Sequence, residues 1–286
     1  MIHSDATFSI GKTHKVCQDY AIADSRHAAL RSVWLSDGCS SSPNTDIGAR
    51  LLSLGMQQRL LGLGSAKEIH PLILDTALQK NLRFALRGAK QMGLSATALD
   101  ATLLGLVCVP GSEQDSVSAV LYGDGAVVFG RSDGRREVYR SQYPAGYPYY
   151  PAYGTDPDRL ASWWAVPNNA QILTRTVLLP NGNVETSETF SPVEPCHVLS
   201  RPAGSLRFAA VLSDGIESFQ AKTGAETSVT SMSVDYLAVV RELTAFKNFK
   251  GEFVHRRLQS FERDCSRRGW HHKDDVSVAA LYFEKE

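Results

Sequence analysis

Two stretches of the chain end in the same three residues: VWLSDG at 33–38 and AAVLSDG at 209–215. In each, an apolar run typical of a β-strand leads into Ser-Asp-Gly. Asp-Gly is a strong hairpin signal, because both residues tolerate the positive φ of a tight turn. A hairpin is therefore the first interpretation to test at both places.

The chain has four Asp-Gly pairs, at Asp37, Asp124, Asp133 and Asp214, and the sequence that follows each pair distinguishes turns from other structures. After Asp133 the chain continues GRREVYR, a returning strand, so this pair predicts a hairpin turn. After Asp37 a polar loop leads into a helical pattern, and after Asp214 comes GIESFQAKTG; neither is a returning strand. A strand-end aspartate, followed by a Gly that lets the backbone turn sharply, can present an oxygen ligand to a hard cation.

The composition is that of an ordinary globular protein of 286 residues, 43% hydrophobic and 21% charged, with 30 basic and 30 acidic residues. This balance gives no electrostatic footprint for nucleic acid or an anionic membrane. No apolar run approaches the roughly 20 residues of a bilayer span, and the N-terminus lacks a signal pattern. Five scattered cysteines without a CxxC pair argue against a disulfide framework or a zinc site. We therefore expect a cytoplasmic protein that binds neither nucleic acid nor membranes.

The spacing of apolar residues predicts a mixed architecture. Helical periodicity predicts two antiparallel helices, from about residue 45 and over about 69–92, and two later ones near 234–246 and 251–268. Strand-like runs lie at 6–10, 20–24, 32–37, 101–109, 116–123, 126–130, 137–140, 207–214 and 276–283. This order suggests an α+β domain with helices packed outside antiparallel sheets.

The least regular part of the chain extends from about 141 to 205. It is too long for a passive connection, so we expect a functional flap or an excursion that covers a sheet edge. Within it, ILTRTVLLPNGNVETSETF at 172–190 predicts a hairpin that turns at Asn181-Gly182. The run QYPAGYPYYPAYG is expected to pack this segment against the body of the protein, with contact to a partner as the alternative.

Two further acidic sites accompany the Ser-Asp-Gly pair. Asp19 precedes one strand-like run, and Asp274 and Asp275 precede the last. Four such sites could converge on one sheet edge, where buried carboxylates need a cation to remain ionised. Oxygen ligands favour Mg²⁺ or Mn²⁺ over zinc, and two such ions about 3.5 to 4 Å apart can activate a water for attack on a phosphate ester. Ordinary turn formation by strand-end aspartates is the alternative.

Six motifs in order resemble the bacterial-type members of the metal-dependent Ser/Thr protein phosphatases of the type 2C (PPM) class. They are GKTHKVCQD at 11–19, VWLSDG, DATLLGLV at 100–107, VLYGDGAVVFG at 120–130, FAAVLSDGIESF at 208–219 and KDDVSVAALYF at 273–283. The resemblance covers about 5–284 and implies one domain over 1–286. It implies a central β-sandwich of two antiparallel sheets flanked by helix pairs, in α-β-β-α layers, with a dinuclear Mg²⁺ or Mn²⁺ site at one end.

By position, the resemblance implies a set of metal ligands. Asp37 would bridge the two ions, and the main-chain carbonyl of Gly38 would ligate one of them. Asp214 and Asp274 would ligate the other ion, and Asp19 would contribute directly or through water. A third, weaker ion would be held with help from the remaining candidate, Asp124, for which a plain hairpin turn is the alternative.

Three positions depart from the family pattern. His14 stands where many members carry an Arg that grips the substrate phosphate, and a His donates only through single nitrogens. Gln18 replaces a frequent acid, and Cys39 replaces a His proposed as general acid in eukaryotic members. His14 is thus, with Asp37, the catalytic candidate, since it could contact the phosphate or protonate the leaving group.

Four other residues are weaker candidates for the site. Asp275 is expected to support a neighbouring ligand, and at most one of His271 and His272 can face the site, since adjacent residues of a strand point apart. Asp100 stands where the family tends to have Gly, and we expect it to mark a solvent-facing strand start.

The leading hypothesis is hydrolysis of phosphoserine or phosphothreonine on a protein substrate, in one step, by a water or hydroxide that bridges the metals. We expect a monomeric enzyme. The alternative is a pseudophosphatase, or phosphoprotein-binding module, that keeps the fold with weak or no catalysis; the three departures motivate it. A phosphatase that forms an aspartyl-phosphate would need a DxD after its first strand, and neither Ser-Asp-Gly stretch provides one.

Overall fold

The computed structural model describes residues 1–24, 30–61, 71–109, 116–191, 196–223 and 230–284. Most of its strands form two antiparallel sheets. The seven-stranded sheet comprises, in pairing order, β1 (Ile2–Ser9), β15 (Val276–Phe283), β11 (Leu206–Leu212), β6 (Gly125–Arg131), β7 (Arg136–Gln142), β8 (Ile172–Leu178) and β9 (Val184–Phe190). The five-stranded sheet comprises β10 (Cys196–Pro202), β5 (Ser116–Tyr122), β4 (Leu103–Cys108), β3 (Arg31–Ser36) and β2 (Tyr20–Ala23).

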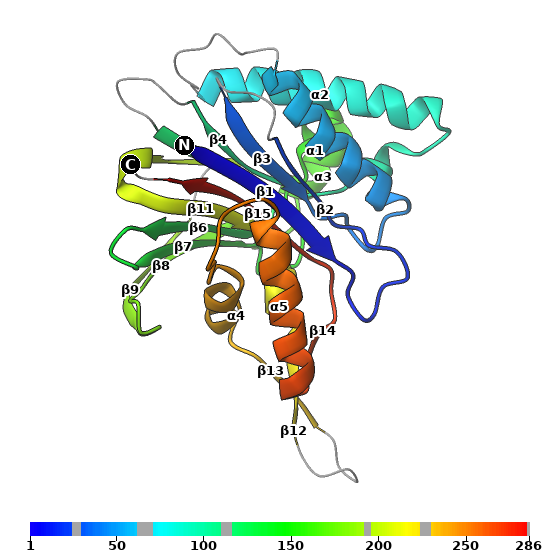
Figure 1. Ribbon diagram of the computed structural model, residues 1–286. Coiled ribbons are helices and arrows are strands. Elements are labelled where there is room, and N and C mark those ends of the chain that lie inside the picture. Colours follow the sequence, from blue (N-terminus) through cyan, green and yellow to red (C-terminus); the bar gives the residue numbers. More distant parts are fainter. Residues whose placement is uncertain (25–29, 62–70, 110–115, 192–195, 224–229, 285–286) are drawn as a thin grey trace.

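Helices cover both outer faces of this sandwich. They are α1 (Thr45–Leu61), α2 (Pro71–Gln91), α3 (Pro157–Trp164), α4 (Tyr236–Leu243) and α5 (Phe253–Arg268). Figure 1 shows α1 and α2 on one side of the sheets and α4 and α5 on the other. A small third sheet consists of β13 (Thr230–Ser233), β12 (Phe219–Thr223) and β14 (Trp270–His272). The expected α-β-β-α sandwich is therefore confirmed.

The sheets pack face to face around an apolar core. Val33 and Leu106 of the smaller sheet meet Val127, Phe129 and Leu281 of the larger sheet, and all five are fully buried. Helices cover the opposite faces, so several central strands are buried on both sides, and β4 is buried along its whole length. This double burial explains why these strands have nearly continuous apolar sequences.

Each helix pair buries one stripe of apolar side chains, as the helical periodicity predicted. Leu52 of α1 and Leu82 of α2 pack on Trp34 of the smaller sheet. On the other side, Phe261 of α5 packs in the cluster that contains Val128 of the larger sheet. Among the described residues, no helix is long and apolar enough to cross a lipid bilayer.

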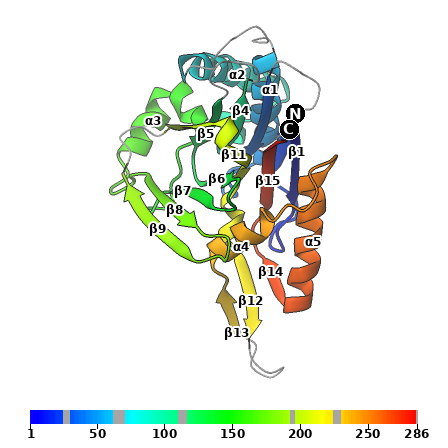
Figure 2. The same ribbon diagram turned by 60° about the vertical axis from the view of Figure 1, so that its left-hand side comes forward.

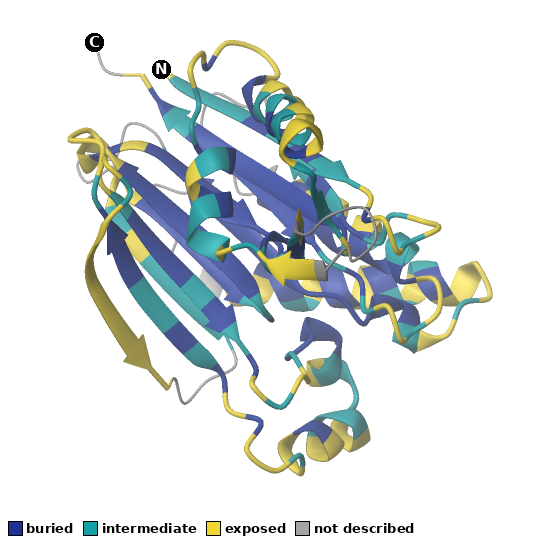
Figure 3. Ribbon diagram, turned by 90° about the horizontal axis from the view of Figure 1, so that it is seen from below, coloured by how far each residue is buried: buried dark blue, intermediate teal, exposed yellow. Residues whose placement is uncertain are grey.

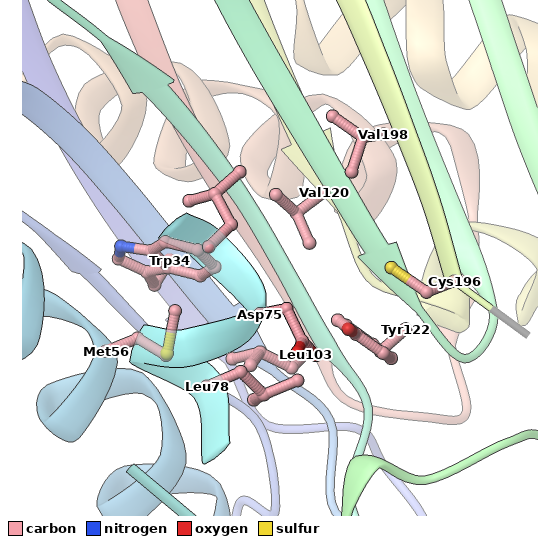
Figure 4. Close-up of a pocket in the computed structure, with 10 residues that line it drawn as sticks. Trp34, Met56, Asp75, Leu78, Leu103, Val120, Tyr122, Cys196 and Val198 are labelled. Atoms are coloured by element: carbon pink, nitrogen blue, oxygen red, sulfur yellow. The ribbon is translucent and has the colours of Figure 1, made fainter. Parts of the chain in front are cut away.

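A cavity of about 300 Å³ remains between the α1–α2 pair and the smaller sheet (Figure 4). Its walls are largely apolar, with Trp34 at one end and Tyr122 and Cys196 at the other. Asp75 is the one carboxylate among the described lining residues. None of the predicted metal ligands lines this cavity, so the cavity is not the predicted phosphatase site.

Residues 141–205 are more regular than the sequence indicates. The predicted hairpin is confirmed as β8 and β9, with Gly182 at the turn (φ 90°), and β9 forms an exposed edge of the larger sheet (Figure 3). Strand β10, which the sequence analysis missed, extends the smaller sheet by pairing with β5. Its sequence CHVLSRP has little alternation and ends in Pro, so no local pattern indicates a strand.

The irregular excursion is confined to about 143–171 and contains α3. Its aromatic side chains Tyr143, Tyr149 and Trp163 form a buried cluster. Trp163 donates a hydrogen bond from Nε1 to the carbonyl of Tyr147 at 3.0 Å. The expectation that the Tyr- and Pro-rich segment packs against the body is confirmed for these residues.

Candidate active site

The predicted carboxylates come together because of antiparallel pairing. Strand β3 ends beside the start of β2, so Asp37 and Asp19 leave the smaller sheet at the same edge. In the larger sheet, the end of β11 pairs near the start of β15 and with the start of β6. Asp214, Asp274 and Asp124 therefore also leave at one end. Asp37 lies within electrostatic range of both groups, which joins them into one cluster.

A serine hydroxyl ties the two sheets together at this end. Ser213 donates a hydrogen bond from Oγ to Oδ2 of Asp19 at 2.7 Å, and it accepts one from the amide of Ser277 at 2.9 Å. Oδ1 of Asp19 and Oδ1 of Asp214 are buried and have no hydrogen-bond partner among the described residues. Buried carboxylate oxygens without a partner are costly, and a bound cation would satisfy them.

The carboxylates strongly perturb one another. Asp37 lies close enough to Asp19 and Asp214 for the three carboxylates to act on one another. Burial, followed by the charges of Asp19 and Asp214, raises the pKa of Asp37 well above its usual range. Burial raises the pKa of Asp19 to about 7, and burial followed by the charge of Asp214 raises the pKa of Asp124. The cluster therefore holds protons that a cation would displace.

The glycine of each Ser-Asp-Gly stretch is required by close packing. A Cβ on Gly38 would lie 2.8 Å from the Thr45 side chain, and one on Gly215 would lie 1.7 Å from the Asp275 carbonyl oxygen. Neither glycine has a positive φ. The chain turns at Asp214, which begins a one-turn 3-10 helix over Asp214–Glu217, and both glycines also stand at close approaches between segments.

Of the other two Asp-Gly pairs, only Asp133-Gly134 is a hairpin turn. Gly134 has φ 87° between β6 and β7, as predicted. Gly125, at the start of β6, has φ 129°, and Asp124 lies where the chain crosses from β5 of the smaller sheet to β6 of the larger sheet. The hairpin alternative for Asp124 is therefore wrong, and the charge of Asp214 acts on Asp124 at this crossing.

His14 lies against two carboxylates. Its Nδ1 is 3.0 Å from Oδ2 of Asp275, and its Nε2 is 3.4 Å from Oδ1 of Asp274. Burial alone would lower the pKa of His14, but the Asp275 and Asp274 carboxylates raise it. Asp275 also accepts hydrogen bonds from the amides of Gly11 (2.7 Å) and Gln18 (2.6 Å). The structure therefore uses Asp275 to hold the loop that carries His14.

Gln18 and the two adjacent histidines lie close to this loop. The amide Nε2 of Gln18 donates to Oγ1 of Thr45 at 2.7 Å, at the start of α1. Nδ1 of His272 lies 2.8 Å from the carbonyl oxygen of Asp274. Both His271 and His272 line a separate groove with Lys12.

Tyr150, from the irregular segment, was not singled out by the sequence. Burial, followed by a hydrogen bond with Cys39, raises the pKa of the Tyr150 phenol, and the charges of Asp124 and Asp37 act in the same direction. Cys39 also lies 3.0 Å from the Ser41 hydroxyl. No local signal distinguishes Tyr150 from the other tyrosines of its run.

Asp100 departs from its expected role. It is 5% exposed rather than facing solvent, and it is ion-paired with Arg159 of α3. Ser42 also donates a hydrogen bond to it at 2.8 Å. The expectation of a solvent-facing strand start is wrong, because α3 folds over this position and supplies a counter-charge.

The donor chemistry fits hard divalent cations. Every predicted ligand is an oxygen, from carboxylates or from the Gly38 carbonyl, and two of the carboxylate oxygens are buried without partners. In the part of the chain that the structure describes, no three His, Cys, Asp or Glu side chains already surround a single point as metal ligands. The side chains would therefore have to reorient around a cation.

Comparisons with known proteins agree with this fold. The sequence matches the family model described as Protein phosphatase 2C over residues 10–246. A bacterial serine phosphatase structure is 10% identical with a TM-score of 0.54, covering 100% of this chain and 99% of that chain. The serine/threonine phosphatase of S. agalactiae is 13% identical (TM-score 0.52, 99% and 100% covered), and Stp1 from Staphylococcus aureus is 12% identical (TM-score 0.51, 100% and 96% covered). Among curated proteins, no significant match was found.

The chain belongs to the protein phosphatase 2C family. It is accordingly an enzyme of the protein serine/threonine phosphatase class, which acts on phosphoproteins. Members of this family are generally metal-dependent.

Proposed function

We propose that the carboxylate end of the sandwich hydrolyses phosphoserine and phosphothreonine monoesters on proteins in one step, with two Mg²⁺ or Mn²⁺ ions. The residues that would hold them are Asp19, Asp37, Asp214, Asp274 and the carbonyl of Gly38. Asp124 would help to hold a third, weaker ion. The observation that carries the proposal is the convergence of these oxygens from strand ends far apart in the chain, two of them buried and unpartnered.

Bound divalent cations would supply two things: a water of lowered pKa and positive charge that offsets the phosphate oxygens. The side chains of the protein would position the reacting groups and transfer protons. Asp37, whose pKa is raised by burial and by the charges of Asp19 and Asp214, would lose its proton when cations bind. His14, whose pKa is raised by carboxylates, would hold a proton at Nε2 and give it to the leaving serine or threonine oxygen.

The binding-module alternative rests on His14, Gln18 and Cys39. The six oxygen-ligand positions implied by the family pattern are all present, and a module without catalysis has no need of them. We further propose a single domain over 1–286, because strands from both halves of the chain share one core between the sheets. We also propose a cytoplasmic location; the structure joins none of the five cysteines, all of them described, in a disulfide.

The test is hydrolysis of p-nitrophenyl phosphate and of a phosphothreonine peptide with Mn²⁺, with Mg²⁺ and with chelator. We expect metal-dependent turnover that falls at least a hundredfold in Asp37→Asn and in Asp214→Asn. Asp133→Asn, a hairpin aspartate that is 51% exposed, is the matched control and should keep full activity. Unchanged turnover in both ligand variants would refute the assignment. No turnover with any metal, from a folded protein that binds metal, would favour the binding module.

A further inference from the structure

A second groove, with a volume of about 460 Å³, lies beside the carboxylate cluster. Its walls come from the end of β1, from β12 and β14, and from the last turns of α5. Figure 2 shows β12 and β14 beside the lower part of α5. Phe219 and Cys265, both buried, contribute apolar surface, and Trp270 lines the groove as well.

The rim of this groove is basic. Lys12 and Lys222 line it, Lys273 follows directly after β14, and all three are exposed. Within the described residues, no ion pair involves any of these lysines; Glu262 is the one lining carboxylate, and its Oε1 lies 4.0 Å from Nε2 of His272. The groove is thus lined by two ammonium groups, with a third directly after β14, and it has little compensating negative charge.

His271 lines the groove and is affected by the positive charge of these lysines. Its Nδ1 is buried and has no hydrogen-bond partner among the described residues. Burial, followed by the charges of Lys12, Lys222 and Lys273, lowers the pKa of His271. An anion in the groove would face several cationic or donor groups at once.

The groove is contiguous with the proposed catalytic centre. The amide of Lys12 donates to the carbonyl of His272 at 3.2 Å, and the amide of Thr13 donates to that of Lys273 at 3.1 Å. The same segment reaches Asp274 one residue later. Strand β14 ends at His272, so the three residues from His271 to Asp274 span at most about 11 Å. An extended substrate peptide covers that distance in at most about three residues.

We propose that this groove binds an anionic group of the phosphoprotein substrate, carried about three residues from the phosphorylated serine or threonine. The inference rests on the proposed function, since it assigns the groove to the substrate of the same site. A carboxylate and a second phosphoryl group share the chemistry that exposed lysines attract. The apolar surface of Phe219 and Trp270 strengthens that attraction by reducing the local dielectric constant.

The first experiment compares phosphothreonine peptides that differ at one position. The peptides carry Ala, Glu or phosphoserine three residues before or three residues after the phosphothreonine. We expect at least one anionic series to have a KM about three- to tenfold below that of its Ala peptide, with kcat unchanged. Comparing KM between the Glu and the phosphoserine peptides shows which anion the groove prefers. Equal KM values for all peptides would overturn the proposal.

Charge reversal in the groove is the second arm. Lys222→Glu should abolish the preference for anionic peptides and leave kcat/KM for p-nitrophenyl phosphate unchanged, because Lys222 is exposed and not part of the proposed catalytic machinery. Lys247→Glu, at an exposed lysine before the start of α5, is the matched control and should keep the preference. A preference that survives Lys222→Glu would contradict the assignment of the groove.

A binding measurement separates this proposal from the proposed function. Calorimetry in chelator measures whether unphosphorylated Glu- and Ala-containing peptides bind, without any turnover. Stronger binding of the Glu peptide, lost in Lys222→Glu, would support the groove even if no peptide were hydrolysed. Turnover without any dependence on the flanking charge would leave the catalytic proposal intact and reject the groove.

Discussion

The buried carboxylate of Asp275 lies 3.0 Å from Nδ1 of His14 and accepts hydrogen bonds from the amides of Gly11 and Gln18. One side chain therefore holds both ends of the loop that carries His14 and leads into Asp19. The position of a predicted catalytic residue thus depends on a neighbour that we do not expect to bind metal.

Asp275→Asn should reduce kcat/KM about 10- to 100-fold, because the loop loses a charged acceptor and His14 loses its counter-charge. The Asp275 carboxylate raises the pKa of His14, so removing its charge lowers that pKa. If a protonated His14 is needed, activity is lost as pH rises, and the variant should lose it at a lower pH. The pH dependence of kcat/KM measures this shift, with Asp133→Asn as the control. An unchanged profile would contradict the link between the two residues.

His14→Ala should raise KM for a phosphothreonine peptide about tenfold, since a hydrogen bond to a charged phosphate is lost. His14→Arg should not raise it, because a guanidinium can replace the donor. Steady-state kinetics on one peptide compares the two variants. An unchanged KM in the alanine variant would remove His14 from the phosphate pocket.

The metal-free protein should become less stable as pH rises from about 5 to 7.5. The folded-state pKa values of Asp19, Asp37 and Asp214 are raised, so the native state holds protons that the unfolded chain has already released. Their contribution is fully present below the unfolded pKa and is lost as pH rises through the folded values. Calorimetry in chelator should show Tm falling over this range, by about 2–4 °C for each 1 kcal/mol lost from the free energy of unfolding.

Metal addition should reverse this trend. Mn²⁺ keeps the carboxylates ionised, so its effect on Tm should be larger at pH 7.5 than at pH 5. Asp37→Asn removes the need to keep a proton on this side chain in the folded state, so in chelator at pH 7.5 it should raise Tm, and it should abolish the increase caused by Mn²⁺. A Mn²⁺ effect equal in the wild type and in Asp37→Asn would count against Asp37 as a ligand.

The Asp100–Arg159 pair should fasten α3 to the smaller sheet. Asp100→Asn and Arg159→Gln should each cost about 1–2 kcal/mol in the free energy of unfolding, because the pair is only partly exposed. Urea denaturation of both single variants and the double variant measures the coupling, which should be at least 0.5 kcal/mol. Limited proteolysis within 143–171 should become faster in either variant. Strictly additive costs would show that the ion pair contributes nothing.

Much of the fold follows from local sequence patterns. Helical spacing predicted α1, α2, α4 and α5, and apolar runs predicted the central strands. The hairpins at Asp133 and Asn181 follow from turn chemistry. Strand β10 did not follow, because its edge position depends on pairing with β5 and its own residues alternate poorly.

The sequence by itself determined that acidic residues stand at strand ends, and antiparallel pairing then brings Asp19, Asp37, Asp124, Asp214 and Asp274 to one end of the sandwich. Only the tertiary structure decided the surroundings of that cluster. The need for glycine at Gly38 and Gly215 comes from close neighbours across the fold. The contacts of Tyr150 and Arg159, and the basic groove at Lys222, likewise join residues far apart in the chain. Such contacts depend on how sheets and helices pack, and no local periodicity encodes them.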